Sequence, residues 1–416
     1  MATATTPAPV RSPWLAARWF VPALLLYLAA TFCSLHFFNR KYDLRHNDLA
    51  GRQFVTREAL LTGADPYSPQ MRHRIQDVAG HDPAQGFDYP VLLAVLLVPV
   101  ASLPWETLRI AFLLVLTPAL FASFWLWVSF TYPLSTPAGK IAITLLCLCS
   151  WPVIFALRLQ QPTLLVALLV FPAWWLLSRQ HDLPAGILLA LSTFKPQLVL
   201  PLLLWLLLWA ISRRRWTLMA TFAVTEILFF LASQLLVPGW LPLWIADLHR
   251  YRSIAANLPL QLILGRPLGI AATCALAAWS SWYLWRVRRC PPPSADFAQA
   301  FALLLALGVC VTPVTWAMVY NQVLLIPASL LFLSSAPHSK SGPPALVYRA
   351  AQALLVWSFA SVALSALCGM VAWSEAWLIF PFLNHLLAPM LALALLSAPL
   401  RQQILLDSSV GRSVFA

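Results

Sequence analysis

The sequence predicts an all-α polytopic membrane protein. Of its 416 residues, 61% are hydrophobic and only 10% are charged, whereas soluble domains carry about 25% charged residues. Mean hydropathy is +0.76, and apolar runs recur along the chain, as expected for helices in lipid. A net charge of +13 would favour nucleic acid in a soluble protein. Here it indicates topology instead, because Lys and Arg collect in short cytoplasmic loops.

Twelve apolar runs are candidate membrane-spanning helices. They are 15–37, 107–131, 140–157, 163–178, 183–194, 196–211, 216–237, 267–285, 297–312, 318–335, 350–373 and 379–400. No small-residue cleavage site follows the first run before the charged loop, which predicts a retained signal anchor. A further run, 89–103, contains Pro90 and Pro99 and is short for a span, which takes about 20 helical residues.

Basic clusters set the expected orientation. Those expected in the cytoplasm are Arg179, Arg213-Arg214-Arg215, Arg286-Arg288-Arg289, Lys340 with Arg349, and Arg401. The first two share a side only if 183–211 crosses twice, turning at Lys195. Each arm is only about 18–24 Å long at 1.5 Å per residue, so Lys195 is expected below the outer surface. Membrane crossings counted from a cytoplasmic N-terminus agree with the sides set by the basic clusters only if 89–103 does not cross. This run is therefore predicted to be a re-entrant or interfacial helix.

The chain is then expected to form one membrane domain. Its parts are a cytoplasmic tail (1–14), a first extracytoplasmic loop with short helices (39–106), core helices (107–237), a second extracytoplasmic loop (238–266) and C-terminal helices (267–416). The polar candidates for a site all open on the extracytoplasmic face in this arrangement.

The first loop is far more polar than the rest of the chain. Residues 40–88 hold seven of the fourteen carboxylates and seven of the twenty-seven Lys and Arg. Such a loop is either functional or a solvated tether. Asp48 lies just beyond the first helix, with Asp43 as its nearest competitor, and neighbouring arginines would keep it ionised, as suits a base for a hydroxyl proton. The alternative is a solvated ion pair with Arg52, four residues on.

A short amphipathic helix and a turn are predicted further along this loop. Residues 57–61 have the helical pattern, and Thr62-Gly63 is a stop signal. The turn follows at Asp65-Pro66-Tyr67. Because Gly63 frees the backbone and Pro66 stiffens it, the turn is expected to aim Tyr67 inward.

Two ionisable residues lie within apolar runs. Lys195 is a functional hypothesis by default, because a charge in the membrane is costly unless it lines water or meets an anion. A lipid-linked phosphate would lie at about its depth; the alternative is snorkelling to the interface. Glu226, midway along 216–237, either pairs with Lys195 across neighbouring helices or faces a cavity.

External arginines form a second group of candidates. Arg158, Arg250 and Arg252 flank aromatic residues, and the planar guanidinium suits phosphate, although interfacial anchoring would explain them as well. The aromatic residues of the 238–266 loop fit an interfacial belt or a platform for a sugar.

Several common motifs are missing from the sequence. It has no phosphate-binding glycine loop, no CxxC or HExxH, and no serine nucleophile motif, so nucleotide chemistry in the cytoplasm is not expected. The seven cysteines lie almost entirely in or beside apolar runs, which argues against a disulfide framework. Neither a metal site nor a cofactor is expected, and nucleic acid is not an expected partner.

Five segments in order resemble the membrane-embedded GT-C glycosyltransferases. The likeness is to glycosyltransferase family 87, the polyprenol-phosphate-mannose-dependent mannosyltransferase group. The segments are NDLAGRQFVTREALLTGADPYSP (47–69), FDYPVLLAVLLVPVASLPW (87–105), LRLQQPTLLVALL (157–169), AGILLALSTFKPQLVLPLLLWLLLWAISRRRW (185–216) and, more loosely, TPVTWAMVYNQVLLIP (312–327). The resemblance covers about residues 15–330 and implies a GT-C-like bundle of about 12 transmembrane helices.

The resemblance implies an inverting transfer of a sugar, mannose or similar, from a polyprenyl-phosphate donor to a lipid or glycan acceptor. The site would face outward from a bacterial cytoplasmic membrane. Asp48, by its position before LLTGADPY, would be the general base, and Lys195 would neutralise the departing phosphate. Gln160 and Gln161 match a polar loop facing the site. The other substrate-binding candidates are Arg158, Arg252, Arg52 and Tyr67.

The sequence departs from the family at the last segment. Many relatives have a histidine shortly after the tryptophan that corresponds to Trp316, where this chain has Ala-Met-Val. Asn321 is the expected substitute. A transporter or flippase of lipid-linked sugars is the rival hypothesis; internal repeats would favour it, and none is convincing. An inactive scaffold for envelope assembly is the third.

Overall fold

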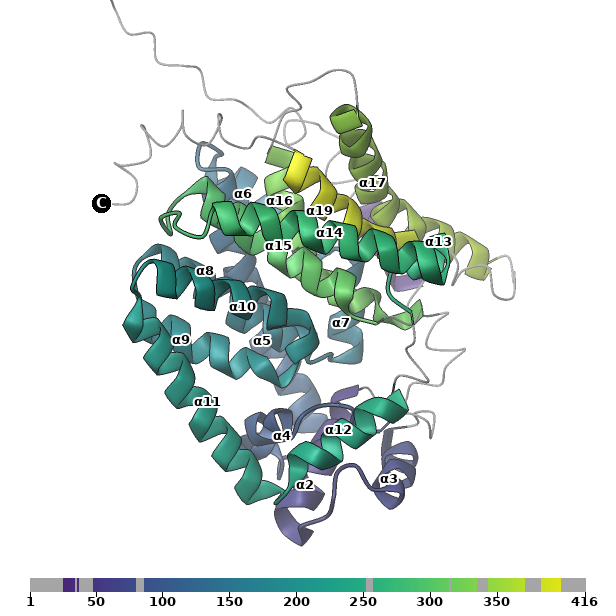
Figure 1. Ribbon diagram of the computed structural model, residues 1–416. Coiled ribbons are helices and arrows are strands. Elements are labelled where there is room, and N and C mark those ends of the chain that lie inside the picture. Colours follow the sequence, from purple (N-terminus) through teal and green to yellow (C-terminus); the bar gives the residue numbers. More distant parts are fainter. Residues whose placement is uncertain are drawn as a thin grey trace, which may run out of the picture.

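The computed structural model describes residues 25–33, 36, 48–79, 86–251, 257–313, 316–334, 343–370 and 383–397. Over these ranges the regular structure is helical. Short helices gather at one end of a bundle of apolar helices, in the lower part of Figure 1. The first expected span, 15–37, is described only at 25–33 and 36, which are helical.

Three described helices are long and apolar enough to cross a bilayer. They are α5 (Trp105–Thr131), α11 (Trp216–Leu236) and the Ala345–Leu364 part of α17 (Pro343–Met370). Most other apolar helices have 10–17 residues, among them α8 (Thr163–Ser178), α9 (Asp182–Leu191), α10 (Pro196–Ser212), α15 (Ala295–Val311) and α19 (Leu387–Ser397). The chain is a membrane-integral protein, while the number of about 12 spans stays a prediction.

The candidate span 140–157 contains a bend. It is divided into α6 (Pro137–Leu148) and α7 (Trp151–Leu159), which meet at an angle of 56°. Ser150 precedes α7, and Pro152 in the first turn of α7 has no N–H to continue the α6 ladder. The run 318–335 is likewise divided, into the 3₁₀ helix η3 (Trp316–Leu325) and α16 (Ile326–Ser334).

The core is formed where α5, α8, α10 and α15 pack together. Trp127 of α5 and Trp174 of α8 stack with ring centroids 3.9 Å apart. Helices α10 and α15 approach closely at Gly308, where a Cβ atom would lie 2.0 Å from the Leu198 carbonyl oxygen. Small residues allow such backbone contact between membrane helices. The contact fixes the start of α10, and with it the turn that carries Lys195.

Basic helix ends come together at one end of the bundle. Arg215, before α11, forms an ion pair with Asp182 at the start of α9. Arg213, after α10, donates to the Arg289 carbonyl oxygen (3.4 Å), which follows α14 (Arg266–Arg286). The three connections between helices that contain these residues, all expected in the cytoplasm, are therefore neighbours in space.

Four short helices lie at the opposite end. These are α2 (Asp48–Thr62), α3 (Pro69–Ala79), α4 (Val91–Leu97) and α12 (Trp240–Tyr251) (Figure 1). Helix α2 begins earlier than the 57–61 pattern predicts and ends at Thr62, where Gly63 takes a left-handed φ of 66°. The longer helix matters because it places Asp48 and Arg52 one turn apart.

The segment 89–103 begins and ends beside the first-loop helices. The Tyr89 carbonyl oxygen accepts a hydrogen bond from the Tyr67 hydroxyl (2.8 Å), and that of Leu103 accepts one from Gln53 Nε2 (2.7 Å). Between them, α4 is followed directly by the 3₁₀ turn η1 (Val98–Val100). Ten helical residues rise only about 15 Å, half of a bilayer core. That this segment does not cross stays a prediction, and both observations support it.

Candidate active site

Helix α2 supplies one acidic and one basic side chain to the same region. Asp48 is its first residue, where the exposed N–H groups of a helix favour negative charge. Arg52, one turn later, has only 5% of its surface exposed. Helix α2 therefore does not present the solvated ion pair that was the alternative for these two residues.

The Arg52 guanidinium has unused hydrogen-bonding capacity. Its Nε and Nη1 atoms are buried without a hydrogen-bond partner, and the group lies 5.3 Å from the centroid of the Tyr89 ring. Burial alone would lower the pKa of Arg52, but the Asp48 carboxylate and further neighbours raise it above its ordinary value. A charged, buried guanidinium with unpaired donors is costly unless an anion meets it. The arrangement suits a phosphate.

Lys195 supplies the second buried basic side chain. It lies between the 3₁₀ turn η2 (Ser192–Phe194) and α10, and Pro196 at the start of α10 disfavours helical geometry at the preceding residue. The turn directs the side chain inward, where it is 3% exposed. Lys195 does not snorkel to the surface.

The Lys195 ammonium group is held by neutral oxygens and aromatic rings. It donates to Thr163 Oγ1 and, over 3.1 Å, to Asn321 Oδ1. The ring centroids of Tyr320 and Tyr89 lie 5.1 and 5.7 Å from Nζ. These contacts are compatible with a charged ammonium but do not neutralise it as a carboxylate at the same distance would.

Asp48, Arg52 and Lys195 form one electrostatic cluster. The negative charge of Asp48 stabilises the charged forms of Arg52 and Lys195. The positive charge of Arg52 opposes that of Lys195. The Tyr89 ring lies near both cations. A carboxylate thus stands beside two buried cations at the same end of the bundle as the first-loop helices, which is an arrangement able to accept a proton and to bind an anion together.

The other expected residues differ in their neighbours. Asn321 contacts Lys195 directly. Gln160 takes a left-handed φ of 49° and donates from Nε2 to the Arg109 carbonyl oxygen (2.8 Å), and Arg158 has Arg109 as its electrostatic neighbour. Gln161 is buried, with Oε1 unpaired. Arg252 and the competing Asp43 lie outside the described residues.

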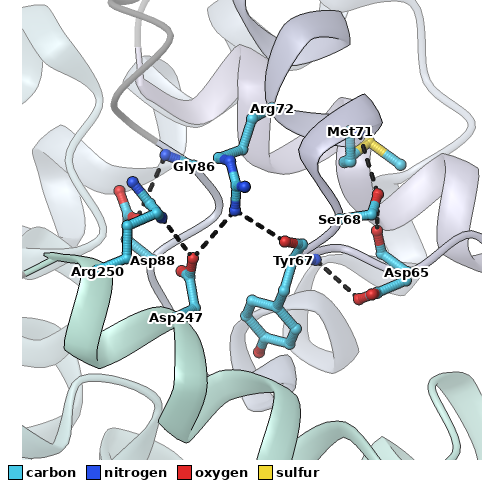
Figure 2. A network of polar contacts seen from close by, with 9 residues as sticks. All are labelled: Asp65, Tyr67, Ser68, Met71, Arg72, Gly86, Asp88, Asp247 and Arg250. Atoms are coloured by element: carbon cyan, nitrogen blue, oxygen red, sulfur yellow. Dashed lines mark hydrogen bonds and ion pairs between the residues drawn. The ribbon is translucent and has the colours of Figure 1, made fainter.

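Tyr67 points inward, as the turn predicts, but its hydroxyl contacts backbone. Its N–H donates to the Asp65 carboxylate (2.9 Å; Figure 2), and its hydroxyl donates to the Tyr89 carbonyl oxygen. Burial raises the pKa of this phenol, so it stays a donor at neutral pH. Tyr67 therefore supports the segment that carries Tyr89.

Sequence reasoning missed three residues of the cluster: Thr163, Tyr89 and Tyr320. Tyr89 belongs to the FDYP stretch between the charged loop and an apolar run, and a ring at that boundary is a usable signal. Thr163 follows the two glutamines and resembles any helix-starting threonine, so it carries no comparable signal. Glu226 interacts with the Thr193 side chain, two residues before Lys195, whereas the hydrogen bonds of Lys195 go to Thr163 and Asn321.

The helical membrane fold thus brings one carboxylate and two buried basic side chains together. The sequence profile of glycosyltransferase family 87 matches residues 87–313, more than half of the chain. The chain therefore belongs to glycosyltransferase family 87, a family of the GT-C class. No curated protein and no solved structure matches the chain. Tyr89, Thr163 and Lys195 lie within the matched residues, while Asp48, Arg52 and Asn321 lie outside them.

Proposed function

We propose that this membrane glycosyltransferase moves a sugar, mannose or similar, from a polyprenyl-phosphate donor to a hydroxyl of a lipid or glycan acceptor. The observation that carries the proposal is the placement of Asp48 beside two buried cations, one of which has unpaired donors. A lipid-linked phosphate can reach such a site from the membrane, and the sugar is then presented to the carboxylate.

The proposed reaction is a single displacement. Asp48 accepts the proton of the acceptor hydroxyl, whose oxygen bonds to the anomeric carbon as the bond from that carbon to the phosphate oxygen breaks. The electron pair of that bond leaves on polyprenyl phosphate. Because attack and departure take place on opposite faces of the sugar, the configuration at the anomeric carbon inverts.

The two cations stabilise the leaving group. Arg52 can offer its unpaired Nε and Nη1 donors to phosphate oxygens, and Lys195 adds a point charge held by Thr163 and Asn321. Donors fixed in advance where charge develops are usually the largest catalytic term. Arg158 and Arg252 are the further candidates for the leaving phosphate, and Gln160 and Gln161 are assigned to a polar loop that faces the site.

The site is proposed to face the outside of a bacterial cytoplasmic membrane. The basic ends near Arg215 and Arg289 lie together, away from the first-loop helices, and basic residues favour the cytoplasmic side. Asp48, Arg52 and Lys195 belong to the other end.

Cysteine labelling tests this orientation. Glu106, at the start of α5, is exposed, with 67% of its side-chain surface accessible. We expect Glu106→Cys to react with a membrane-impermeant maleimide on intact spheroplasts, because α5 then begins outside. His181→Cys, at the exposed turn between α8 and α9, is the matched control and should react only after lysis. The reverse pattern would place the site in the cytoplasm.

The function itself is tested by a panel of donors. Purified protein is offered polyprenyl-phosphate sugars that differ in the sugar and in chain length, together with an extract of membrane lipids as acceptors. We expect release of polyprenyl phosphate with at least one donor and a product of inverted anomeric configuration. Movement of a donor across proteoliposomes without release would instead indicate a transporter, and neither release nor movement would indicate a scaffold.

A further inference from the structure

A closed circuit of polar contacts involves Asp88 and the Tyr89 carbonyl oxygen and joins the two external loops. The Asp88 carboxylate accepts from Arg250 Nη2 (2.8 Å), and Arg250 Nε donates to Asp247 (2.9 Å). Asp247 also accepts from Arg72 (3.5 Å), which donates to the Tyr67 carbonyl oxygen (2.9 Å). The Tyr67 hydroxyl closes the circuit on the Tyr89 carbonyl oxygen. Figure 2 shows these side chains converging from α3, α12 and the 86–88 segment.

Arg250 is the central member of this circuit. It uses two different nitrogens to hold two carboxylates, one on its own helix and one from the first loop. The Asp247 and Asp88 side chains are only 4% and 10% exposed, so neither charge is well solvated. Burial raises the pKa of Asp88, while Arg52 and Arg250 act in the opposite direction. Arg250 therefore compensates two poorly hydrated like charges.

The circuit also fixes an uncommon backbone conformation. Asp88 has a left-handed φ of 56°, which few residues other than glycine, Asn and Asp adopt readily. Its carboxylate accepts from the Gly86 N–H (3.3 Å) as well as from Arg250. A side chain at Gly86 would lie 3.0 Å from Arg250 Nη2 and 3.2 Å from Arg72 Cγ. The 86–88 segment is thus packed tightly between the two arginines.

The next residue, Tyr89, contacts the candidate site. Its ring lies 5.3 Å from the Arg52 guanidinium and 5.7 Å from Lys195 Nζ. The positive charges of two neighbouring basic side chains repel each other, and the electron-rich face of an aromatic ring stabilises each of them. The φ of Asp88 and the hydrogen bond to the Tyr89 carbonyl oxygen orient the backbone that carries this ring. Both of these are held by the circuit.

We propose that Asp88 and Arg250 are positioning residues of the transfer reaction, which fix Tyr89 and through it the two phosphate-binding cations. The second external loop is then required for donor binding, because Arg250 of its helix α12 holds the segment that precedes Tyr89. This inference rests on the proposed function in so far as Arg52 and Lys195 bind the donor phosphate.

The test compares Arg250→Lys with Arg74→Lys. Lysine keeps the charge at 250, but one ammonium group cannot reproduce the fork that spans two carboxylates. Arg74 is the matched control because its guanidinium pairs with Glu58 (2.8 Å) in the same external region and is 49% exposed. We expect Arg250→Lys to lower kcat/KM for the donor about 10- to 100-fold, as small misplacements do, mainly through KM. Arg74→Lys should match the wild type.

Two further readouts keep the proposal falsifiable. Hydrogen exchange should be faster at residues 86–97 in Arg250→Lys and in the milder Asp88→Asn, and not in Arg74→Lys. Farnesyl phosphate, a short soluble probe, should bind these two variants more weakly. Both measurements remain informative if the wild type transfers no sugar, which would count against the proposed function alone. Unchanged exchange, or faster exchange with unchanged probe binding, would overturn the positioning role.

Discussion

Asp48→Asn is expected to lower the transfer rate about 10²- to 10⁴-fold, the usual contribution of a general base. The amide keeps the size and position of the side chain at the start of α2 but accepts no proton at neutral pH. Because Arg52 and Lys195 remain, donor binding should persist. The measurement is initial-rate formation of product from the donor identified by the panel, with farnesyl phosphate binding measured on the same preparation.

Glu58→Gln is the matched control for this substitution. Glu58 lies on the same helix and pairs with Arg74 away from the cluster, so its loss should leave the rate unchanged. Asp43→Asn addresses the competing carboxylate. Full activity in Asp48→Asn would remove Asp48 from the mechanism, and a selective loss in Asp43→Asn would assign the base there.

Lys195→Met is expected to lower kcat/KM about 10²- to 10³-fold, the effect of losing one preorganised donor to a developing oxyanion. Unlike Asp48→Asn, it should also weaken farnesyl phosphate binding. Thermal stability in detergent should be kept or increased, because the substitution removes a buried charge. Thr163 and Asn321 would still satisfy each other, since their oxygens lie 3.0 Å apart.

This combination separates a functional lysine from a structural one. A lysine that only supported the fold would lose stability and rate together when replaced. Lys140→Met is the control, since Lys140 lies in the first turn of α6, at the far end of α5 from the site. Unchanged kcat/KM and probe binding in Lys195→Met would contradict the role assigned to this residue.

The turn at Lys195 was predictable because it follows from local rules. Two short apolar arms, a proline and a lysine between them permit few alternatives, and the structure has a 3₁₀ turn followed by a helix that starts at Pro196. The stop at Gly63 follows from the same kind of rule. In contrast, no break was predicted within the candidate span 140–157. Composition alone does not show that Ser150 and Pro152 would divide it.

The site could be predicted only residue by residue. Asp48, Lys195 and Asn321 were each candidates, and the roles proposed for them still await the variants above. Their proximity depends on how α2, α10 and η3 pack, and no periodicity within any one of them encodes that contact. Arg158 and Lys195 were both candidates for the phosphate, yet Arg158 has Arg109 as its electrostatic neighbour and Lys195 has Asp48.

By itself, the sequence determined that this protein is helical, lies in a membrane and carries one unusually charged loop, because composition and hydropathy act locally and additively. It also marked Lys195, since a cation within an apolar run is conspicuous. Only the tertiary structure decided that this lysine shares Tyr89 with Arg52. Only the tertiary structure shows that Arg250 from the second loop holds the segment before the Tyr89 ring. Long-range packing makes those contacts, and charge and burial then determine what they can bind.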